Sequence, residues 1–215
     1  DSKESLNEIL AMVKENNHDD WLGKFKALSK IEFEKVIKAD LHPTKEGLTM
    51  GEVLKEINIQ SGGKAAIVSD VGQHQMIACR YAEFTQSRGN ITSGGLGTMG
   101  FALPAAIGAK MACPGREVVA VIGDGGYQMT IQELGTIFQT KAAVKIVVLN
   151  NDFLGMVRQW QQLFFDKRYA STEMTNPDFV TIAKGYHIDA KRVTKRENLA
   201  LSLIHISEPT RQWQI

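Results

Sequence analysis

Two short apolar runs, each ending in polar or glycine residues, constrain the fold more than any other feature of this sequence. They occupy residues 118–122 and 144–149 and are rich in β-branched side chains, which is typical of strands covered on both faces. Between them, residues 130–133 (TIQE) have the spelling of a capping box, and apolar residues follow at helical spacing. The segment therefore predicts two parallel strands joined through a helix by a right-handed crossover.

Polar residues follow both predicted strands. Residues 123–126 (GDGG) come after the first run, and residues 150–151 (NN) come after the second. The carboxyl ends of parallel strands meet at one edge of a sheet, where open α/β sheets bind ligands. Carboxylate and amide oxygens suit Mg²⁺, while glycines and a helix start let backbone N–H groups approach phosphates. The sequence therefore predicts a metal-bound diphosphate site, with an ordinary glycine turn and surface loop as the alternative.

Three longer strings surround this pair of motifs. They are SDVGQHQM at 69–76, TSGGLGTMGFALPAAIGA at 92–109 and LNNDFLGMVRQWQ at 149–161. With them, the chain resembles the catalytic large subunit of acetolactate synthase, also called acetohydroxyacid synthase, from about Leu48 to about Ala200. The resemblance implies an α/β fold, a parallel sheet with helices on both faces that binds thiamine diphosphate. A helical tail of a middle domain would precede it.

The same resemblance implies roles for individual residues. Met99 would support the bent conformation of the cofactor, and Met156 and Trp160 would shape the pocket for the second substrate. Mg²⁺ would be bound by Asp124, Asn151 and the backbone carbonyl of Phe153. The residues expected to bind the cofactor are Gln73, His74, Gly97, Met99, Gly123, Asp124, Gly125, Gly126, Asn151, Phe153, Gly155 and Met156.

The activity implied by the resemblance is thiamine diphosphate-dependent decarboxylation of pyruvate and its joining to a second pyruvate or 2-ketobutyrate. It belongs to branched-chain amino acid biosynthesis. The family uses a glutamate from another domain, which this chain lacks, so we expect the isolated chain to be inactive. The resemblance also implies FAD bound chiefly by the middle domain, a homodimer or tetramer, and a small regulatory subunit.

The sequence divides into three regions. Residues 1–43 are charged and helical in pattern, which predicts the end of a middle domain and its linker. Residues 44–200 alternate strand and helix signals and form the predicted cofactor-binding domain. Residues 201–211 (LSLIHISEPTR) resemble a translated sequencing adapter, so we expect residues 201–215 to be a non-native tail.

Composition excludes some partners. The net charge of +1, from 25 basic and 24 acidic residues, does not favour a nucleic-acid or membrane surface. Cys79 and Cys113 lack metal-binding or disulfide spacing, and we expect them to be buried, reduced thiols in a cytoplasmic protein.

Two alternatives stay open at this point. Another thiamine diphosphate enzyme, such as a pyruvate oxidase or a 2-keto acid decarboxylase, would share the metal motifs. The glycines at 95, 97 and 100 spell G-x-G-x-x-G, which is typical of a dinucleotide-binding module. That signal is weak alone, because residues 90–92 are a poor strand before the glycines, although residues 101–111 are helical in pattern.

Overall fold

A four-stranded parallel sheet forms the centre of the larger of two compact units in this computed structural model, which describes residues 1–203. The strand order is β2-β1-β3-β4. The strands are β1 (Ala66–Ser69), β2 (Asn90–Thr92), β3 (Val118–Gly123) and β4 (Lys145–Leu149). Gly123 pairs with Leu149 in the parallel register of β3 and β4. The predicted parallel pair is confirmed, and the GDGG and NN motifs follow neighbouring strands at the same edge.

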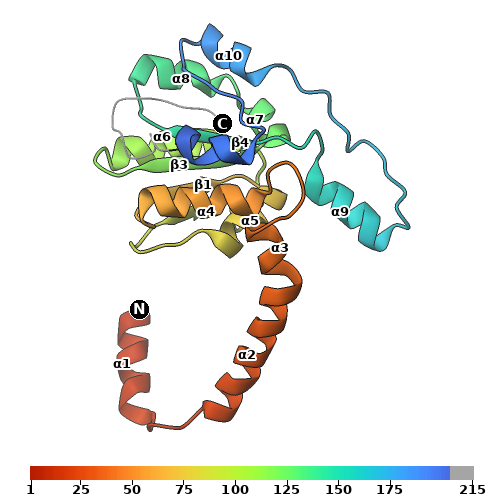
Figure 1. Ribbon diagram of the computed structural model, residues 1–215. Helices are drawn as coiled ribbons and strands as arrows, with labels where there is room; N and C mark the ends of the chain where they lie inside the picture. Colours follow the sequence, from red (N-terminus) through yellow and green to blue (C-terminus); the bar gives the residue numbers. More distant parts are fainter. Residues whose placement is uncertain (204–215) are drawn as a thin grey trace. The chain divides into compact units, whose positions relative to one another are not determined.

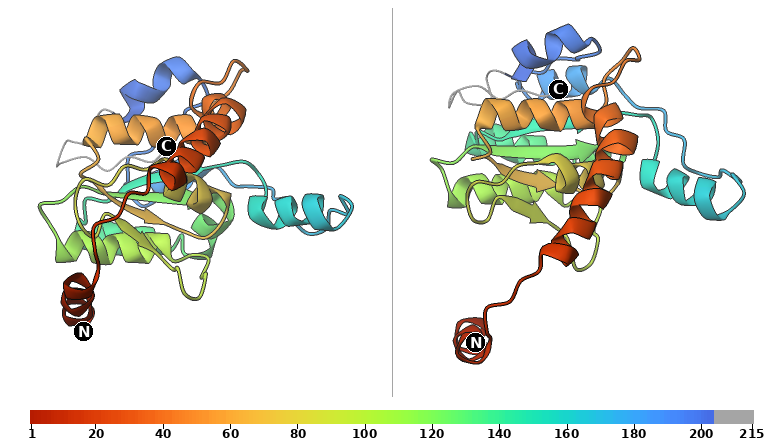
Figure 2. Two further views of the ribbon diagram at one scale, coloured as in Figure 1. Left: turned by 90° about the horizontal axis from the view of Figure 1, so that it is seen from below. Right: turned by 60° about the horizontal axis from the view of Figure 1, so that its bottom comes forward.

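Helices cover both faces of this sheet. Alternate residues of β1, β3 and β4 join one apolar core with α6 (Ala102–Ala112), α8 (Glu133–Thr140) and α10 (Phe179–Gly185). The opposite face packs against α5 (Gln73–Tyr81), which contacts α4 (Met50–Ser61); α4 in turn contacts α11 (Leu199–Leu203). Figure 2 shows α4 and α6 on opposite sides of the strands. Because both faces are buried, the strands read as continuous apolar runs.

Two further helices belong to the connections. α7 (Asp124–Met129) follows β3 directly, and α9 (Gly155–Phe164) follows the loop after β4. Figure 1 shows α9 standing out from the side of the sheet. A short 3₁₀-helix, η2 (Arg196–Asn198), precedes α11.

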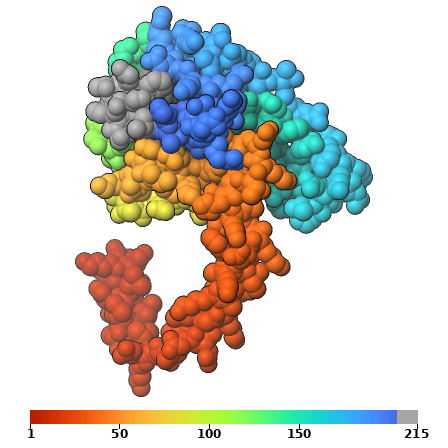
Figure 3. All heavy atoms as spheres, viewed as in Figure 1, coloured from red at the N-terminus to blue at the C-terminus, as the bar shows by residue number. Residues whose placement is uncertain are grey.

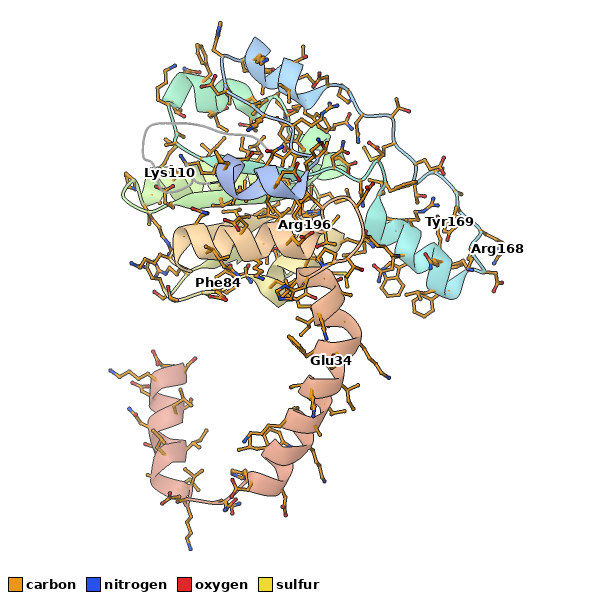
Figure 4. The ribbon with its side chains drawn as sticks, in the orientation of Figure 1. Glu34, Phe84, Lys110, Arg168, Tyr169 and Arg196 are labelled. Carbon is orange, nitrogen blue, oxygen red and sulfur yellow. The ribbon has the colours of Figure 1, made fainter. Side chains whose placement is uncertain are left out.

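Arg196 connects the beginning and the end of this unit (Figure 4). Its guanidinium donates to the carboxylate of Glu52 and to the carbonyl oxygen of Gly47 at 2.7 Å. Glu52 also completes a true capping box with Thr49 at the start of α4. Burial raises the pKa of Glu52, but the hydrogen bonds from Arg196 and from the Thr49 N–H outweigh it and lower the pKa overall. The pair therefore fixes the segment that leads into the sheet.

The predicted capping box at residues 130–133 is wrong. A helix begins earlier, at Asp124, and Thr130 ends it. The Thr130 hydroxyl donates to the Gly100 carbonyl at 3.1 Å, while the Glu133 N–H bonds to the Thr130 carbonyl in a tight turn. In the described chain no side chain caps α8. The local sequence pattern did not decide the structure here, because Thr130 instead contacts the loop that contains Gly95, Gly97 and Gly100.

Two other expectations are corrected. Residues 90–92, which we judged a poor strand, form edge strand β2, because pairing with β1 on one side compensates for weak intrinsic propensity. Both cysteines are exposed rather than buried. Cys79 lies on the outer side of α5, and Cys113 lies just after the last residue of α6.

The smaller unit, Asp1–Ala39, is helical, as its pattern predicts. It contains α1 (Ser2–Met12), α2 (Asp19–Glu32) and a π-helical turn, η1 (Phe33–Ile37), and α3 (Lys38–Leu41) crosses its boundary. Its apolar side chains are largely exposed, for example Leu10 and Leu28. The helices end at Leu41, before Pro43. Its assignment to a middle domain stays a prediction.

The expected non-native tail lies mostly outside the described residues, which end at 203. Residues 201–203 form the end of α11, where Ser202 and Leu203 are buried. The adapter interpretation of residues 201–215 stays a prediction.

Candidate functional site

A cavity of about 180 Å³ opens at the carboxyl edge of the sheet, between the ends of β1 and β3. Strand order reverses between these strands, since β2 lies on one side of β1 and β4 beyond β3. This reversal is the switch point at which open α/β sheets bind ligands. Every residue that we expected to bind the cofactor lines this cavity: Gln73, His74, Gly97, Met99, Gly123, Asp124, Gly125, Gly126, Asn151, Phe153, Gly155 and Met156.

Trp160 is the exception among the predicted site residues. It lies on α9 and is 54% exposed. Its ring packs against that of Phe164, with the two ring centroids 5.0 Å apart. The start of α9 reaches the cavity, but the helix rises about 1.5 Å per residue, so Trp160 lies beyond its mouth. In the space-filling view this segment protrudes from the edge of the sheet unit (Figure 3).

Asp124 is the buried acid of the cavity. Its side chain follows β3 directly, and the residue is 2% exposed. Oδ1 accepts the Gly125 N–H at 3.0 Å, and Oδ2 accepts the Asp152 N–H at 2.7 Å and the Asn176 amide at 2.8 Å. Donors from three separate segments therefore stabilise this carboxylate and fix its orientation.

The loop after β4 brings Asn151 to the same cavity. The Asn151 side-chain oxygen accepts the Phe153 N–H at 3.2 Å, and Asp152 between them has a left-handed φ of 59°. This tight turn directs the chain into α9, whose first residue is Gly155. A side chain at 155 would overlap the carboxamide of Gln73 and approach Nδ2 of Asn151 at 3.0 Å. A larger residue at 155 would have to displace the end of the Gln73 side chain.

His74 lies on the floor of the cavity, at the start of α5. It is 5% exposed, and its Nε2 has no hydrogen-bond partner within residues 1–203. Its ring is so close to Gly72 and Gly123 that a Cβ on either glycine would come within 2.7 Å of it. Burial lowers the pKa of His74 to about 4. The imidazole is therefore neutral at pH 7, with one polar atom free for a ligand.

Asp70 connects the loop of Gly95, Gly97 and Gly100 with the GDGG motif. It is fully buried at the end of β1, and its Oδ1 accepts the Phe101 N–H at 3.1 Å. Oδ2 lies where a Cβ on Gly126 would be, and it has no hydrogen-bond partner in the described part of the chain. Burial raises the pKa of Asp70, although backbone N–H groups near Gly100 lower it in part. The contact places Met99 beside the GDGG motif.

Sequence reasoning missed a strap, residues 172–176, that returns to this site after α9. The backbone carbonyl of Thr172 accepts the Leu154 N–H at 2.8 Å, and the backbone carbonyl of Asp152 accepts the Met174 N–H at 2.9 Å. The strap carries Asn176 to Asp124. The only local signal was the run TNPD at 175–178, which marks a turn before α10 but does not indicate its tertiary partner.

Arg158 supports the base of α9 beside the strap. Its guanidinium stacks over the rings of Phe153 and Tyr169, at 4.3 and 4.0 Å from their centroids. Figure 4 shows Tyr169 in the segment that returns alongside α9. Stacking of this kind orders the chain on both sides of the helix.

The donor set fits a cation that is shared with a phosphate. Within residues 1–203, no group of three or more His, Cys, Asp or Glu side chains is placed to hold a metal ion. One buried carboxylate, one carboxamide oxygen and nearby backbone carbonyls are instead the few protein ligands that Mg²⁺ uses when phosphate oxygens and water supply the rest. At glycines 123, 125 and 126, His74, Leu154 and Asp70 take the space that a side chain would fill, so bare backbone forms the cavity wall there.

Comparison with known proteins agrees with this geometry. The family described as "Thiamine pyrophosphate enzyme, C-terminal TPP binding domain" matches residues 70–206, which is more than half of the chain. The chain belongs to this family. The match begins at Asp70 and includes every residue that we expected to bind the cofactor, from Gln73 to Met156.

The curated relatives are acetolactate synthases. The chain is 45% identical over 152 residues to the isozyme 2 large subunit of Escherichia coli K12, covering 70% of this chain and 28% of that protein. It is 43% identical over 211 residues to the large subunit of Cyanidium caldarium, covering 93% and 34% respectively. A mitochondrial acetolactate synthase of Schizosaccharomyces pombe is 48% identical over 152 residues, covering 69% and 23%. The chain therefore spans about a third or less of the length of these relatives.

A solved structure supports the fold. A thiamine diphosphate-dependent 4-hydroxybenzoylformate decarboxylase of Rhodococcus jostii RHA1 superposes with a TM-score of 0.73, over 80% of this chain and 32% of that chain. Its sequence is 23% identical, so the likeness shows the thiamine pyrophosphate-binding fold alone.

The dinucleotide alternative does not fit the topology. The glycines at 95, 97 and 100 follow edge strand β2, whereas a dinucleotide loop follows the strand at the switch point. In this domain the loop instead brings Met99 to the cavity.

We predict that stability depends on pH through His74. The unfolded chain takes up a proton below about 6.5, while the folded ring does so only near 4. Stability is therefore full above pH 6.5 and falls as the pH drops toward 4, by up to about 3 kcal/mol, since each pH unit contributes about 1.4 kcal/mol. Urea unfolding of the parent chain and His74→Gln across this range measures it, with exposed His42→Gln as the control. Equal pH slopes in the parent and His74→Gln would contradict the prediction.

We also predict that position 126 tolerates only glycine. In Gly126→Ala the new methyl group overlaps the Asp70 carboxylate, and such overpacking costs about 1–3 kcal/mol. Gly108→Ala is the matched control, because nothing apart from its neighbours and the backbone of its own helix lies within 4 Å of the Cβ position, and alanine favours a helix interior. Thermal unfolding should show a lower melting temperature for the first variant and an equal or higher one for the second.

Proposed function

We propose that this chain is the cofactor-binding part of an acetolactate synthase large subunit. The observation that carries the proposal is the convergence of all predicted cofactor residues on one cavity at the switch point of the sheet. The identities of 43–48% to acetolactate synthases support this activity over a pyruvate oxidase or a 2-keto acid decarboxylase.

In this proposal the β3–β4 edge binds the diphosphate end of the cofactor. Asp124, Asn151 and the Phe153 carbonyl would hold Mg²⁺, which would neutralise negative charge on the diphosphate. No side chain caps α9 in the described structure, so the backbone N–H groups at its start are available to bind the negatively charged phosphates. Gln73 and the neutral His74 supply polar contacts from the start of α5. The chain thereby anchors the cofactor at one end.

The other groups position the reacting end. Met99 supports the bent form of the cofactor from its glycine loop, which Asp70 and Thr130 hold in place. When bound, thiamine diphosphate supplies the electron sink that lets pyruvate lose carbon dioxide and add to a second 2-keto acid. Met156, at the cavity, and Trp160, further along α9 and outside the cavity, would then shape the approach of that second substrate, pyruvate or 2-ketobutyrate. α9 thus connects the metal loop with substrate selection.

The chain supplies only part of the site. Its cavity of about 180 Å³ is smaller than the roughly 300–1,000 Å³ of pockets that enclose a ligand of cofactor size. We infer that further protein, including the proton-relay glutamate and the FAD site, completes the enzyme, as a homodimer or tetramer with a small regulatory subunit.

Location stays a prediction. None of the helices between residues 1 and 203 is long and apolar enough to cross a membrane. The cytoplasm is the compartment expected from the sequence, while one fungal relative is described as mitochondrial.

Cofactor binding tests the site. Calorimetry should show thiamine diphosphate binding to the chain with Mg²⁺ and much weaker binding with EDTA. Asp124→Asn should weaken binding at least about tenfold, because a metal carboxylate is lost. Asp189→Asn, at an exposed position, is the matched control and should bind as the parent does. Equal affinity of the parent and Asp124→Asn would refute the metal assignment.

Turnover tests the division of the site. The chain alone should form no acetolactate from pyruvate when thiamine diphosphate and Mg²⁺ are supplied, because the proton-relay glutamate is absent. A full-length relative carrying these residues in place of its own domain should form it. Acetolactate production by the isolated chain would show that the missing domains are not needed.

A further inference from the structure

One amide group at the metal site has no role in the function proposed above. Nδ2 of Asn176 lies 2.8 Å from Oδ2 of Asp124, 2.7 Å from Oδ1 of Asn150 and 2.8 Å from Oδ1 of Asp152. These oxygens come from the end of β3 and from the loop after β4. A single donor group therefore joins both strand ends that flank the predicted cation.

The orientation of this amide is fixed by a second side chain. Gln128, on α7, donates its Nε2 hydrogen to Oδ1 of Asn176 at 2.7 Å. The Asn176 oxygen is therefore turned toward Gln128, and its NH₂ group must face the three acceptor oxygens. Because Gln128 belongs to the helix that begins at Asp124, the same helix holds the carboxylate and orients its partner.

The backbone around Asn176 holds the amide in place. The strap pairs with residues 152–154 of the loop after β4. The Leu154 and Met174 N–H groups donate across this pairing, and Phe153 and Glu173 form an antiparallel bridge. Pro177 follows Asn176 and restricts its backbone to extended conformations. The amide is thus positioned before any ligand arrives.

We propose that Asn176 is a positioning residue of the metal site, and this proposal rests on the function proposed above. Its amide and the Asp152 N–H both donate to Oδ2 of Asp124, whereas Oδ1 accepts the Gly125 N–H, so Oδ1 is the less occupied oxygen and would be the one available to a cation. The two hydrogens of this NH₂ group are also shared among three acceptor oxygens, two of them from carboxylates, which would otherwise repel one another. Hydrogen-bonded partners of this kind orient metal ligands and raise metal affinity.

Two variants remove the donor in different ways. Asn176→Leu keeps a similar volume but has no NH₂ group. Gln128→Glu leaves Asn176 in place but puts a carboxylate where its oxygen had a donor, so that oxygen is repelled and the orientation of the amide is no longer fixed. Thr175→Val is the matched control, since Thr175 is exposed on the same strap. Each is measured in the full 215-residue chain.

The probe is Mn²⁺ with saturating thiamine diphosphate, and the readout is the electron paramagnetic resonance signal of free Mn²⁺. Both Asn176→Leu and Gln128→Glu should bind Mn²⁺ about 10- to 100-fold more weakly than the parent. Thr175→Val should stay within about twofold of the parent, because it leaves this hydrogen-bond network intact. Melting temperatures in EDTA should be similar for all four chains, which separates positioning from a general loss of structure.

The outcomes separate the two proposals. Parent-like Mn²⁺ affinity in Asn176→Leu overturns the role of Asn176 while the metal site stands. If Asn176→Leu does not fold in EDTA, Gln128→Glu decides, and parent-like affinity there overturns the role. If the parent itself binds no Mn²⁺ with thiamine diphosphate, both the metal site and the role of Asn176 are refuted.

Discussion

The hydrogen bonds around the Asp124 carboxylate are the interaction on which the rest of the site depends. A buried carboxylate is costly unless N–H donors surround it, and here they come from α7, from the loop after β4 and from the strap. These segments are far apart in sequence, and only the parallel register of β3 and β4 brings them to one edge. The fold therefore makes it possible to bury the ionised Asp124 carboxylate, and the hydrogen bonds to that carboxylate hold the surrounding loops in place.

The glycines of the site reflect crowding rather than flexibility. Gly123 faces the His74 ring, Gly126 faces the Asp70 carboxylate, and Gly155 faces the Gln73 amide. In each case a polar group of another segment occupies the space of a side chain. The cavity wall is built from polar groups packed against bare backbone, which suits a highly charged ligand.

The sequence allowed the central part of this structure to be predicted. The runs at 118–122 and 144–149 fix two buried strands, and parallel pairing then places Asp124 and Asn151 together. Local spelling was less informative where a distant contact decided the outcome, as at Thr130, which bonds to Gly100 and does not cap α8. Asn176 was not predictable, because its three acceptors lie 24 to 52 residues away and no periodic pattern connects them. The exposure of Cys79 depends on which side of α5 meets the sheet, a tertiary property.

The strap has a consequence for how such a domain can vary. It pairs in antiparallel fashion with residues 152–154, at the base of α9. The segment between them, which contains α9, is therefore held at both of its ends. Selection can thus remodel the protruding end of α9 while the buried polar groups at its base are inherited intact, which makes the two ends of this helix separately evolvable.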